Sequence, residues 1–113
     1  MSRAFWEGNM HQQILYKAVT GRNTIKIKYD DDTLEREFSP YIVFYSSKGN
    51  ESVSGYQIDN PAEPMEKNQW RQLTTSKLKT VRTTENTFAV DPRFNPADKV
   101  YGNRVICHVK QNV

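Results

Sequence analysis

Two alternating segments joined by three consecutive aspartates constrain the fold most strongly. In residues 24–29, Ile25, Ile27 and Tyr29 alternate with lysines, the pattern of a strand that buries one face. The aspartates at 30–32 predict a turn, because Asp tolerates turn backbone conformations. Residues 34–38 alternate again, which predicts the returning strand of an antiparallel hairpin.

The hairpin is preceded by a segment with helical spacing. We expect a helix over residues 9–21, capped by Asn9 and carrying one apolar stripe. Gly21 is placed to end this helix in a left-handed conformation. The stripe consists of Met10, Ile14, Leu15, Ala18 and Val19.

The segments after the hairpin predict further strands. Pro40 interrupts the pairing or marks an edge, and residues 41–45 form a buried strand. A turn with Gly49 at positive φ leads into a strand at 52–58, where Gly55 permits a bulge or a close approach. After a loop at 60–68 we expect a strand at 70–73, a helical turn within 74–81, a turn at Asn86 and a final strand at 104–110.

Composition narrows the class of protein further. At 113 residues we expect one domain, and two tryptophans, six tyrosines and five phenylalanines favour a compact sheet or barrel. No apolar run is long enough for a membrane span and no signal segment opens the chain, so we expect no membrane contact and a cytoplasmic location. The single cysteine, Cys107, excludes an intrachain disulfide, and we expect a buried, inert thiol.

No pattern in the sequence predicts catalysis. There is no glycine-rich phosphate loop, no metalloprotease motif and no nucleophile elbow. His11 and His108 fall in different predicted elements, without neighbouring metal ligands. We therefore expect a protein that is not an enzyme and has no cofactor and no metal site.

Basic residues concentrate in one segment. There is no acidic residue between Glu66 and Glu85, although the net charge of the chain is only +3. A local cationic segment attracts anions, and Trp70 at its start is placed to stack a base. The alternative is a solvated basic face over an ordinary core. The basic residues of this segment are Lys67, Arg71, Lys77, Lys79 and Arg82.

Arg36 is unusually placed on the predicted hairpin. It shares a face with Leu34 and Phe38, whereas Glu35 and Glu37 share the opposite face. An arginine on an apolar face needs an anionic partner or a route to water. It therefore pairs with a carboxylate inside the fold or faces a ligand pocket.

The order of these segments resembles a WYL domain, an Sm-like five-stranded β-barrel found in bacterial transcription regulators. The resemblance spans roughly residues 12–94, and the position of the naming Trp-Tyr-Leu triplet reads Glu51, Ser52, Val53. The segments that carry it are I-L-Y-K-A-V-T-G-R (14–22), I-K-I-K-Y (25–29), R-E-F-S-P-Y (36–41), S-V-S-G-Y-Q (52–57) and W-R-Q-L-T-T-S-K-L-K-T-V (70–81).

The resemblance implies a small five-stranded Sm/SH3-like barrel with an N-terminal helix. The barrel would occupy residues 24–90, followed by a C-terminal extension over 91–113 with a final strand. It also implies a basic, aromatic-lined face that binds a nucleotide or single-stranded nucleic acid. The residues implied as ligand contacts are Arg36, Tyr41, Tyr56, Gln57, Trp70, Arg71 and Lys77.

Two functions follow as expectations. The first is a ligand-sensing or regulatory barrel, free-standing and of bacterial, phage or mobile-element origin. The alternative is a protein-interaction or assembly module, in which Phe5 and Trp6 help to form a homodimer or dock a larger partner.

Overall fold

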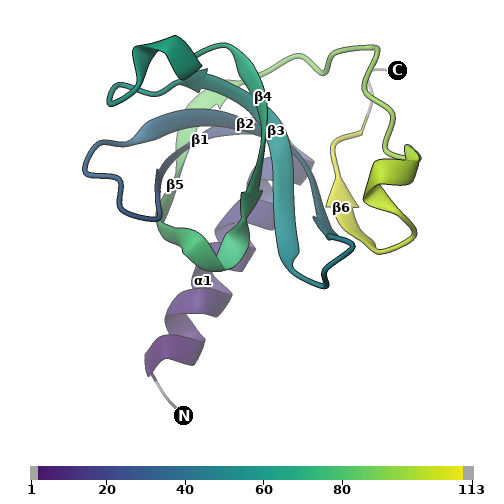
Figure 1. Ribbon diagram of the computed structural model, residues 1–113, viewed down its shortest axis with the longest axis horizontal. Coiled ribbons are helices and arrows are strands. Elements are labelled where there is room, and N and C mark those ends of the chain that lie inside the picture. Colours follow the sequence, from purple (N-terminus) through teal and green to yellow (C-terminus); the bar gives the residue numbers. More distant parts are fainter. Residues whose placement is uncertain (1–2, 111–113) are drawn as a thin grey trace.

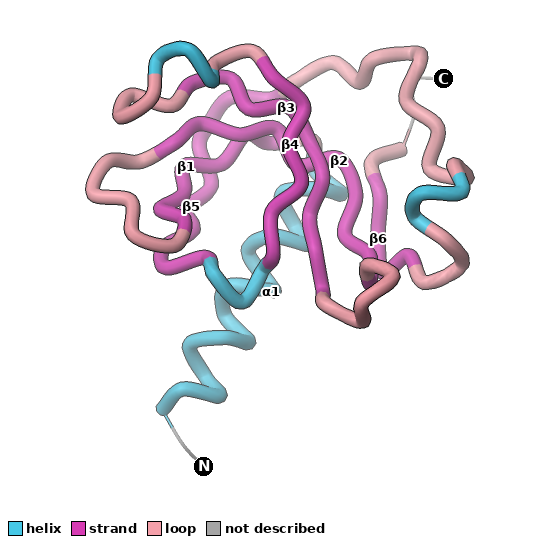
Figure 2. Tube along the Cα trace, viewed as in Figure 1, coloured by secondary structure: helices cyan, strands magenta, loops and turns pink. Residues whose placement is uncertain are grey.

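The computed structural model describes residues 3–110, with side chains described from residue 10 onward. It is mostly β, with one N-terminal helix and a six-stranded antiparallel sheet (Figures 1 and 2). The elements are α1 (Arg3–Gly21), β1 (Asn23–Tyr29), β2 (Arg36–Tyr45), β3 (Glu51–Asp59), η1 (Pro64–Glu66), β4 (Gln69–Thr74), η2 (Thr75–Lys77), β5 (Leu78–Thr87), η3 (Lys99–Tyr101) and β6 (Val105–His108).

Five strands form one continuous path in the order β4-β3-β2-β1-β5, and β6 pairs with β2 beside that path. The sheet curls so that its two end strands, β4 and β5, come to face each other, and η2 connects them (Figure 1). Among residues 3–110 no pairing between β4 and β5 closes it, so the sheet is open along that edge. The mostly-β class and the N-terminal helix are confirmed. The structure shows a curled, open sheet and does not show a closed barrel.

The opening hairpin forms as predicted. Ile25 pairs with Phe38 and Ile27 with Arg36 in antiparallel register. Ile25, Ile27 and Phe38 are buried, because alternation in a strand sends every second side chain to the same face. Asp30 takes a positive φ of 56° in the turn.

β2 is longer than the sequence predicts. It runs through Pro40 without a break, and Pro40 pairs with Gly55 of β3. On its other side β2 pairs with β1 as far as Phe38 and with β6 from Ile42. Pro40 therefore lies where β2 changes neighbours, a local edge at which a missing N–H is tolerated.

At Gly55, β3 lies too close to β2 to leave room for a side chain. A Cβ atom there would lie 2.1 Å from the carbonyl oxygen of Ser39 and 2.9 Å from the Phe38 ring. The close approach predicted for this glycine is confirmed, and the turn glycine Gly49 has the predicted positive φ, 82°.

The helical turn predicted within 74–81 is present as η2 (Thr75–Lys77), but the segment from Leu78 onward is strand. The turn predicted at Asn86 is wrong, since β5 extends to Thr87. Tyr29 pairs with Leu78, but the adjacent Lys28 pairs with Thr80, which leaves Lys79 as an extra residue in a β-bulge. The bulge places Leu78 and Val81, both buried, three positions apart, a spacing that imitates a helix.

α1 is also longer than predicted and begins at Arg3, so its start is not at Asn9. Leu15, Ala18 and Val19 are buried against the sheet, whereas Met10 is 55% exposed. The left-handed residue after the helix is Arg22 (φ 57°) and not Gly21. The first half of the helix projects away from the sheet (Figure 1).

One carboxylate fixes α1 to the sheet. Glu51 Oε1 accepts hydrogen bonds from Gln12 Nε2 (3.2 Å) and the Tyr16 hydroxyl (3.1 Å). Its Oε2 accepts from Thr75 Oγ1 (3.0 Å). Burial and the nearby Glu51 raise the pKa of Tyr16, so the phenol stays protonated and donates. Cys107 is half-buried, where the sequence predicted a buried thiol. Its burial still raises the pKa of the thiol to about 11, which keeps it protonated.

Candidate functional site

Arg36 begins β2, and its guanidinium is held by a neighbouring carboxylate. Its Nε and Nη2 donate to Asp32 Oδ2 (2.7 Å) and Oδ1 (3.0 Å). Its Cζ lies 5.4 Å from the centre of the Tyr29 ring. Burial alone would raise the pKa of Asp32, but the hydrogen bonds from Arg36 and the Tyr29 amide outweigh it and lower that pKa. Asp32 is therefore a carboxylate, and the pairing inside the fold that the sequence left open is present.

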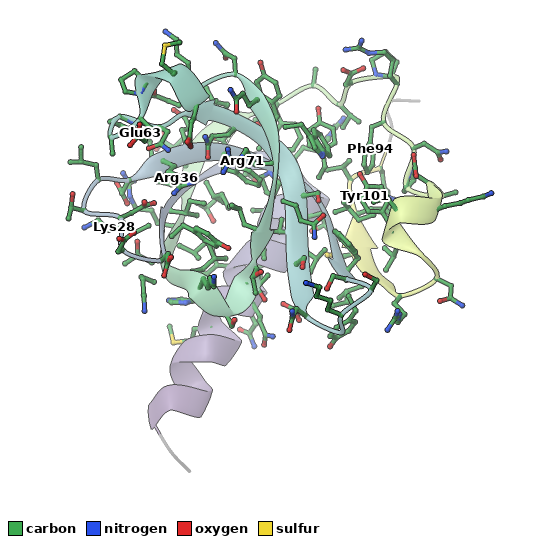
Figure 3. All side chains as sticks on the ribbon, viewed as in Figure 1. Lys28, Arg36, Glu63, Arg71, Phe94 and Tyr101 are labelled. Carbon is green, nitrogen blue, oxygen red and sulfur yellow. The ribbon has the colours of Figure 1, made fainter. Side chains whose placement is uncertain are left out.

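Two hydrogen bonds and one ion pair connect Arg36 to Arg71 through Gln57 and Glu66. Arg36 Nη1 donates to Gln57 Oε1 (3.2 Å), and the buried Gln57 Nε2 donates to the Glu66 carbonyl oxygen (2.7 Å). The Glu66 carboxylate then lies 3.6 Å from Arg71 Nη1. We call this set, Asp32, Arg36, Gln57, Glu66 and Arg71, the inner network. Figure 3 shows Arg36 and Arg71 at the end of the sheet below η1.

The two arginines of the inner network differ in how firmly they are held. Arg36 makes a bidentate pair at side-chain exposures of 12% and 10%, whereas Arg71 meets Glu66 through one contact at 35% and 35%. Glu66 also accepts a long hydrogen bond (3.4 Å) from Asn60 Nδ2. Asn60 is 2% exposed, and its Oδ1 has no hydrogen-bond partner among the described residues. Arg71 and Glu66 are thus the adaptable end of the network.

The predicted aromatic contacts lie on the other face of the sheet. Trp70 precedes Arg71 in β4, so its side chain points the opposite way, and Tyr56 is its direct partner on β3. The Tyr41 ring lies 4.9 Å from the Trp70 ring and is stacked on Phe88 at 5.2 Å. Tyr41 is 5% exposed, and its hydroxyl accepts a hydrogen bond from the Asp91 amide (3.1 Å).

A pocket of about 390 Å³ opens beside Trp70, and we call it the outer pocket. The segment after β5 folds over the sheet and supplies the rest of its wall. Phe94 and Tyr101 lie on the far side of β3 and β4 from Arg36 and Arg71 in Figure 3. The residues that line the pocket are Trp70, Asp91, Arg93, Phe94, Asn95, Asp98 and Tyr101.

The remaining predicted cations do not converge on either site. Lys67 caps η1, Lys77 ends η2, and Lys79 is the bulged residue of β5. Arg82 makes a bidentate pair with Glu35 through two contacts of 2.9 Å. The acidic and basic segments of the sequence thus partly neutralise each other in space, since Glu35 and Glu66 both pair with arginines of the basic segment.

The structure therefore divides the seven predicted ligand contacts. Arg36, Gln57 and Arg71 join the inner network, Tyr41, Tyr56 and Trp70 lie on the outer face, and Lys77 belongs to neither group. The sequence did not single out Phe94, Asp98 or Tyr101, because residues 91–102 have no periodicity. The available signal in the sequence was that Asp91, Asp98 and Tyr101 fall within one short irregular segment.

The described residues also bear on two other classes of site, a membrane span and a metal site. Residues 3–110 contain no helix long and apolar enough to cross a membrane. The same part of the chain brings together no three His, Cys, Asp or Glu side chains that would hold a metal ion. Phe5 and Trp6 lie outside the residues whose side chains are described.

Comparisons with known proteins give a likeness in fold. No protein-family model matches the sequence, and neither does any curated protein. Among solved structures, Proteasome accessory factor B/C (PafBC) of Arthrobacter aurescens is similar, with a TM-score of 0.60 and 17% sequence identity. The match covers 76% of this chain and 13% of that one, which is a WYL-domain-containing regulator. The likeness concerns the fold alone, and it supports a WYL-like fold for the described chain.

Proposed function

We propose that this chain is a non-enzymatic regulatory domain of Sm-like, WYL-like architecture that binds the phosphate of a nucleotide or of single-stranded nucleic acid at the inner network. The observation that carries the proposal is that Gln57 and Arg71 both contact Glu66, while Arg36 donates to Gln57 beside them. The likeness to part of a regulator supports the regulatory role.

The binding step is an exchange of anions on Arg71. A phosphate offers several acceptor oxygens to the guanidinium fork, whereas Glu66 now meets it through a single 3.6 Å contact. Arg36 stays fixed by Asp32 and positions Gln57. The network holds Asp32 ionised by pairing, an arrangement that suits a structural carboxylate better than an acid or base. The proposal is therefore one of binding without catalysis.

The test is fluorescence anisotropy with a labelled ten-nucleotide single-stranded DNA at low and physiological salt, with free nucleotides and RNA as competitors. We expect binding that weakens as salt rises, because phosphate contacts release counterions. Arg71→Ala should weaken it about tenfold or more, the value of a charge-assisted hydrogen bond. Arg82→Ala removes the same charge from the paired, exposed Arg82 and is the matched control.

Two outcomes contradict the proposal. Absence of binding at low salt, where screening is weakest, rejects a phosphate ligand. If Arg71→Ala and Arg82→Ala lose the same DNA affinity, the binding is a general charge attraction and not a contact at the inner network.

A second candidate, an assembly module, is favoured by the projecting half of α1. Met10 on that helix is 55% exposed, and the helix extends beyond the sheet it covers (Figure 1). An exposed apolar side chain such as Met10 is a candidate dimer contact when it belongs to a larger apolar patch. Light scattering at micromolar concentration tests it, with Met10→Glu expected to convert a dimer to monomer. A wild-type monomer at all concentrations rejects the homodimer.

A further inference from the structure

The outer pocket combines aromatic walls with an excess of negative charge. Phe94 and Tyr101 are 8% and 7% exposed, and Trp70 is 45% exposed. The Trp70 and Phe94 rings lie 6.1 Å apart, and Phe94 and Tyr101 6.2 Å apart. Tyr41 and Phe44 support these rings from below, at 4.9 and 5.0 Å. The walls are therefore held in place before any ligand arrives.

The charges around the pocket do not cancel. Arg93 is committed to Asp91 through contacts of 2.9 and 3.2 Å, and this pairing lowers the pKa of Asp91 to about 2. Among the residues whose side chains are described, Asp98 has no such cation partner, and its Oδ1 accepts a hydrogen bond from the Val100 amide (3.0 Å). Burial and the negative charge of Asp98 raise the pKa of Tyr101. The Asp98 carboxylate therefore acts on the Tyr101 ring, which forms part of the pocket wall.

We propose that the outer pocket binds an organic cation, an ammonium or guanidinium group, against Trp70 and Tyr101 with Asp98 as its counter-ion. Aromatic faces attract cations through the ring quadrupole, and the uncompensated carboxylate excludes phosphates from the same site. Because the pocket lies on the opposite face of β4 from Arg71, this site is separate from the inner network and does not depend on the function proposed there.

The cation has two possible sources, a small quaternary amine or a basic side chain of another protein. The probes are therefore choline, N-acetyl-arginine amide and N-acetyl-trimethyllysine amide. The neutral isostere of choline, 3,3-dimethyl-1-butanol, has the same shape without the charge. Trp6→Phe in the full chain leaves Trp70 as the single tryptophan, so its fluorescence reports the pocket.

We expect at least one cation to change Trp70 fluorescence saturably, and the tightest probe identifies the source. Asp98→Asn should weaken that binding about fivefold, the value of one counter-ion near a protein surface. Asparagine still accepts the Val100 amide hydrogen bond, so the turn of η3 keeps its cap. Glu85→Gln on β5 makes the same charge change outside the pocket and should leave binding unchanged.

The proposal is overturned by equal binding of the neutral isostere, by unchanged affinity in Asp98→Asn, or by the lack of a saturable signal from any cation. Stronger binding of adenosine monophosphate than of choline at Trp70 also overturns it, because it makes the outer face a site for bases and phosphates.

Discussion

Trp70 and Arg71 are neighbours in the sequence, but they belong to two sites with opposite preferences. Arg71 points into the inner network, where each charge has a partner of opposite sign. Trp70 points into the outer pocket, where aromatic rings surround a net negative charge. One strand separates the two because successive residues of a strand face opposite ways. Two adjacent residues of a strand therefore do not contribute to the same site, whereas residues two positions apart share a face and can do so.

Both sites are built on the sheet in which β2 and β3 are paired, so the largest effect is expected at Gly55. In Gly55→Val the new Cβ would meet a backbone oxygen at 2.1 Å, which cannot move without opening the sheet. We expect a loss of about 3 kcal/mol or more in the free energy of unfolding, measured in urea. Gly49→Ala has open space but a φ of 82°, and should cost about 1 kcal/mol. If the two substitutions lowered the free energy of unfolding by the same amount, lack of space at Gly55 would not be the main reason for the loss.

The next effect compares two Arg–Asp pairs, one from each region. Asp32→Asn removes the partner of Arg36 at about 10% side-chain exposure, and we expect a loss of about 2 kcal/mol in unfolding free energy at pH 7. Asp91→Asn breaks a pair in which Arg93 is 90% exposed, so its effect on stability should be much smaller. Urea denaturation of both variants checks the difference.

The pH dependence sharpens the same comparison. Folding lowers the pKa of Asp32, so its contribution is complete above the unfolded value of about 4 and is lost as the pH falls through the lower folded value. The stability difference between wild type and Asp32→Asn should therefore shrink below about pH 4. A difference that stays constant from pH 7 to pH 3 would show that the cost is steric and not electrostatic.

The strands could be predicted wherever one face is buried and the other solvated. Ile25 and Ile27 alternate with lysines, and the structure has the strand that this pattern predicts. The i, i+3 spacing of Leu78 and Val81 indicated a helix, although both residues lie in a strand. The bulge at Lys79 shifts the strand alternation by one residue, and the position of a bulge depends on the partner strand. For Pro40 the sequence left open an interruption or an edge, and the structure has a local edge, because β2 exchanges β1 for β6 around that residue.

The candidate sites could be predicted only in part. Arg36 was conspicuous because a charge on an apolar face needs a partner, and Asp32, four residues earlier, supplies it. Glu66 lies in a loop without periodicity, and its contact with Arg71 depends on how η1 folds over the sheet. The outer pocket is formed by an irregular segment that packs on a distant strand, so no local pattern could predict it.

Glu66→Gln tests whether the inner network is an anion site whose present occupant is its own carboxylate. Without that charge, Arg71 should bind labelled single-stranded DNA about fivefold more tightly, the value of one partly exposed ion pair. Choline binding at Trp70 should not change, because Glu66 contacts Arg71, whose side chain lies on the face of β4 opposite to Trp70. Anisotropy and Trp70 fluorescence measure the two affinities on the same variant. A decrease in DNA affinity would mean that Glu66 positions Arg71 for binding.

The smallest effect is expected for Arg82→Ala, which removes a cation that belongs to neither site. Arg82 is 60% exposed and pairs with Glu35, whose pKa it lowers mainly through their hydrogen bonds. Surface pairs of this kind are screened by salt, so the urea midpoint at physiological salt should stay within error of wild type. DNA and choline affinities should also stay unchanged, since Arg82 lies in neither the inner network nor the outer pocket. If DNA affinity instead falls as far as in Arg71→Ala, the ligand follows total charge, and the division of this chain into two faces with different chemistry fails.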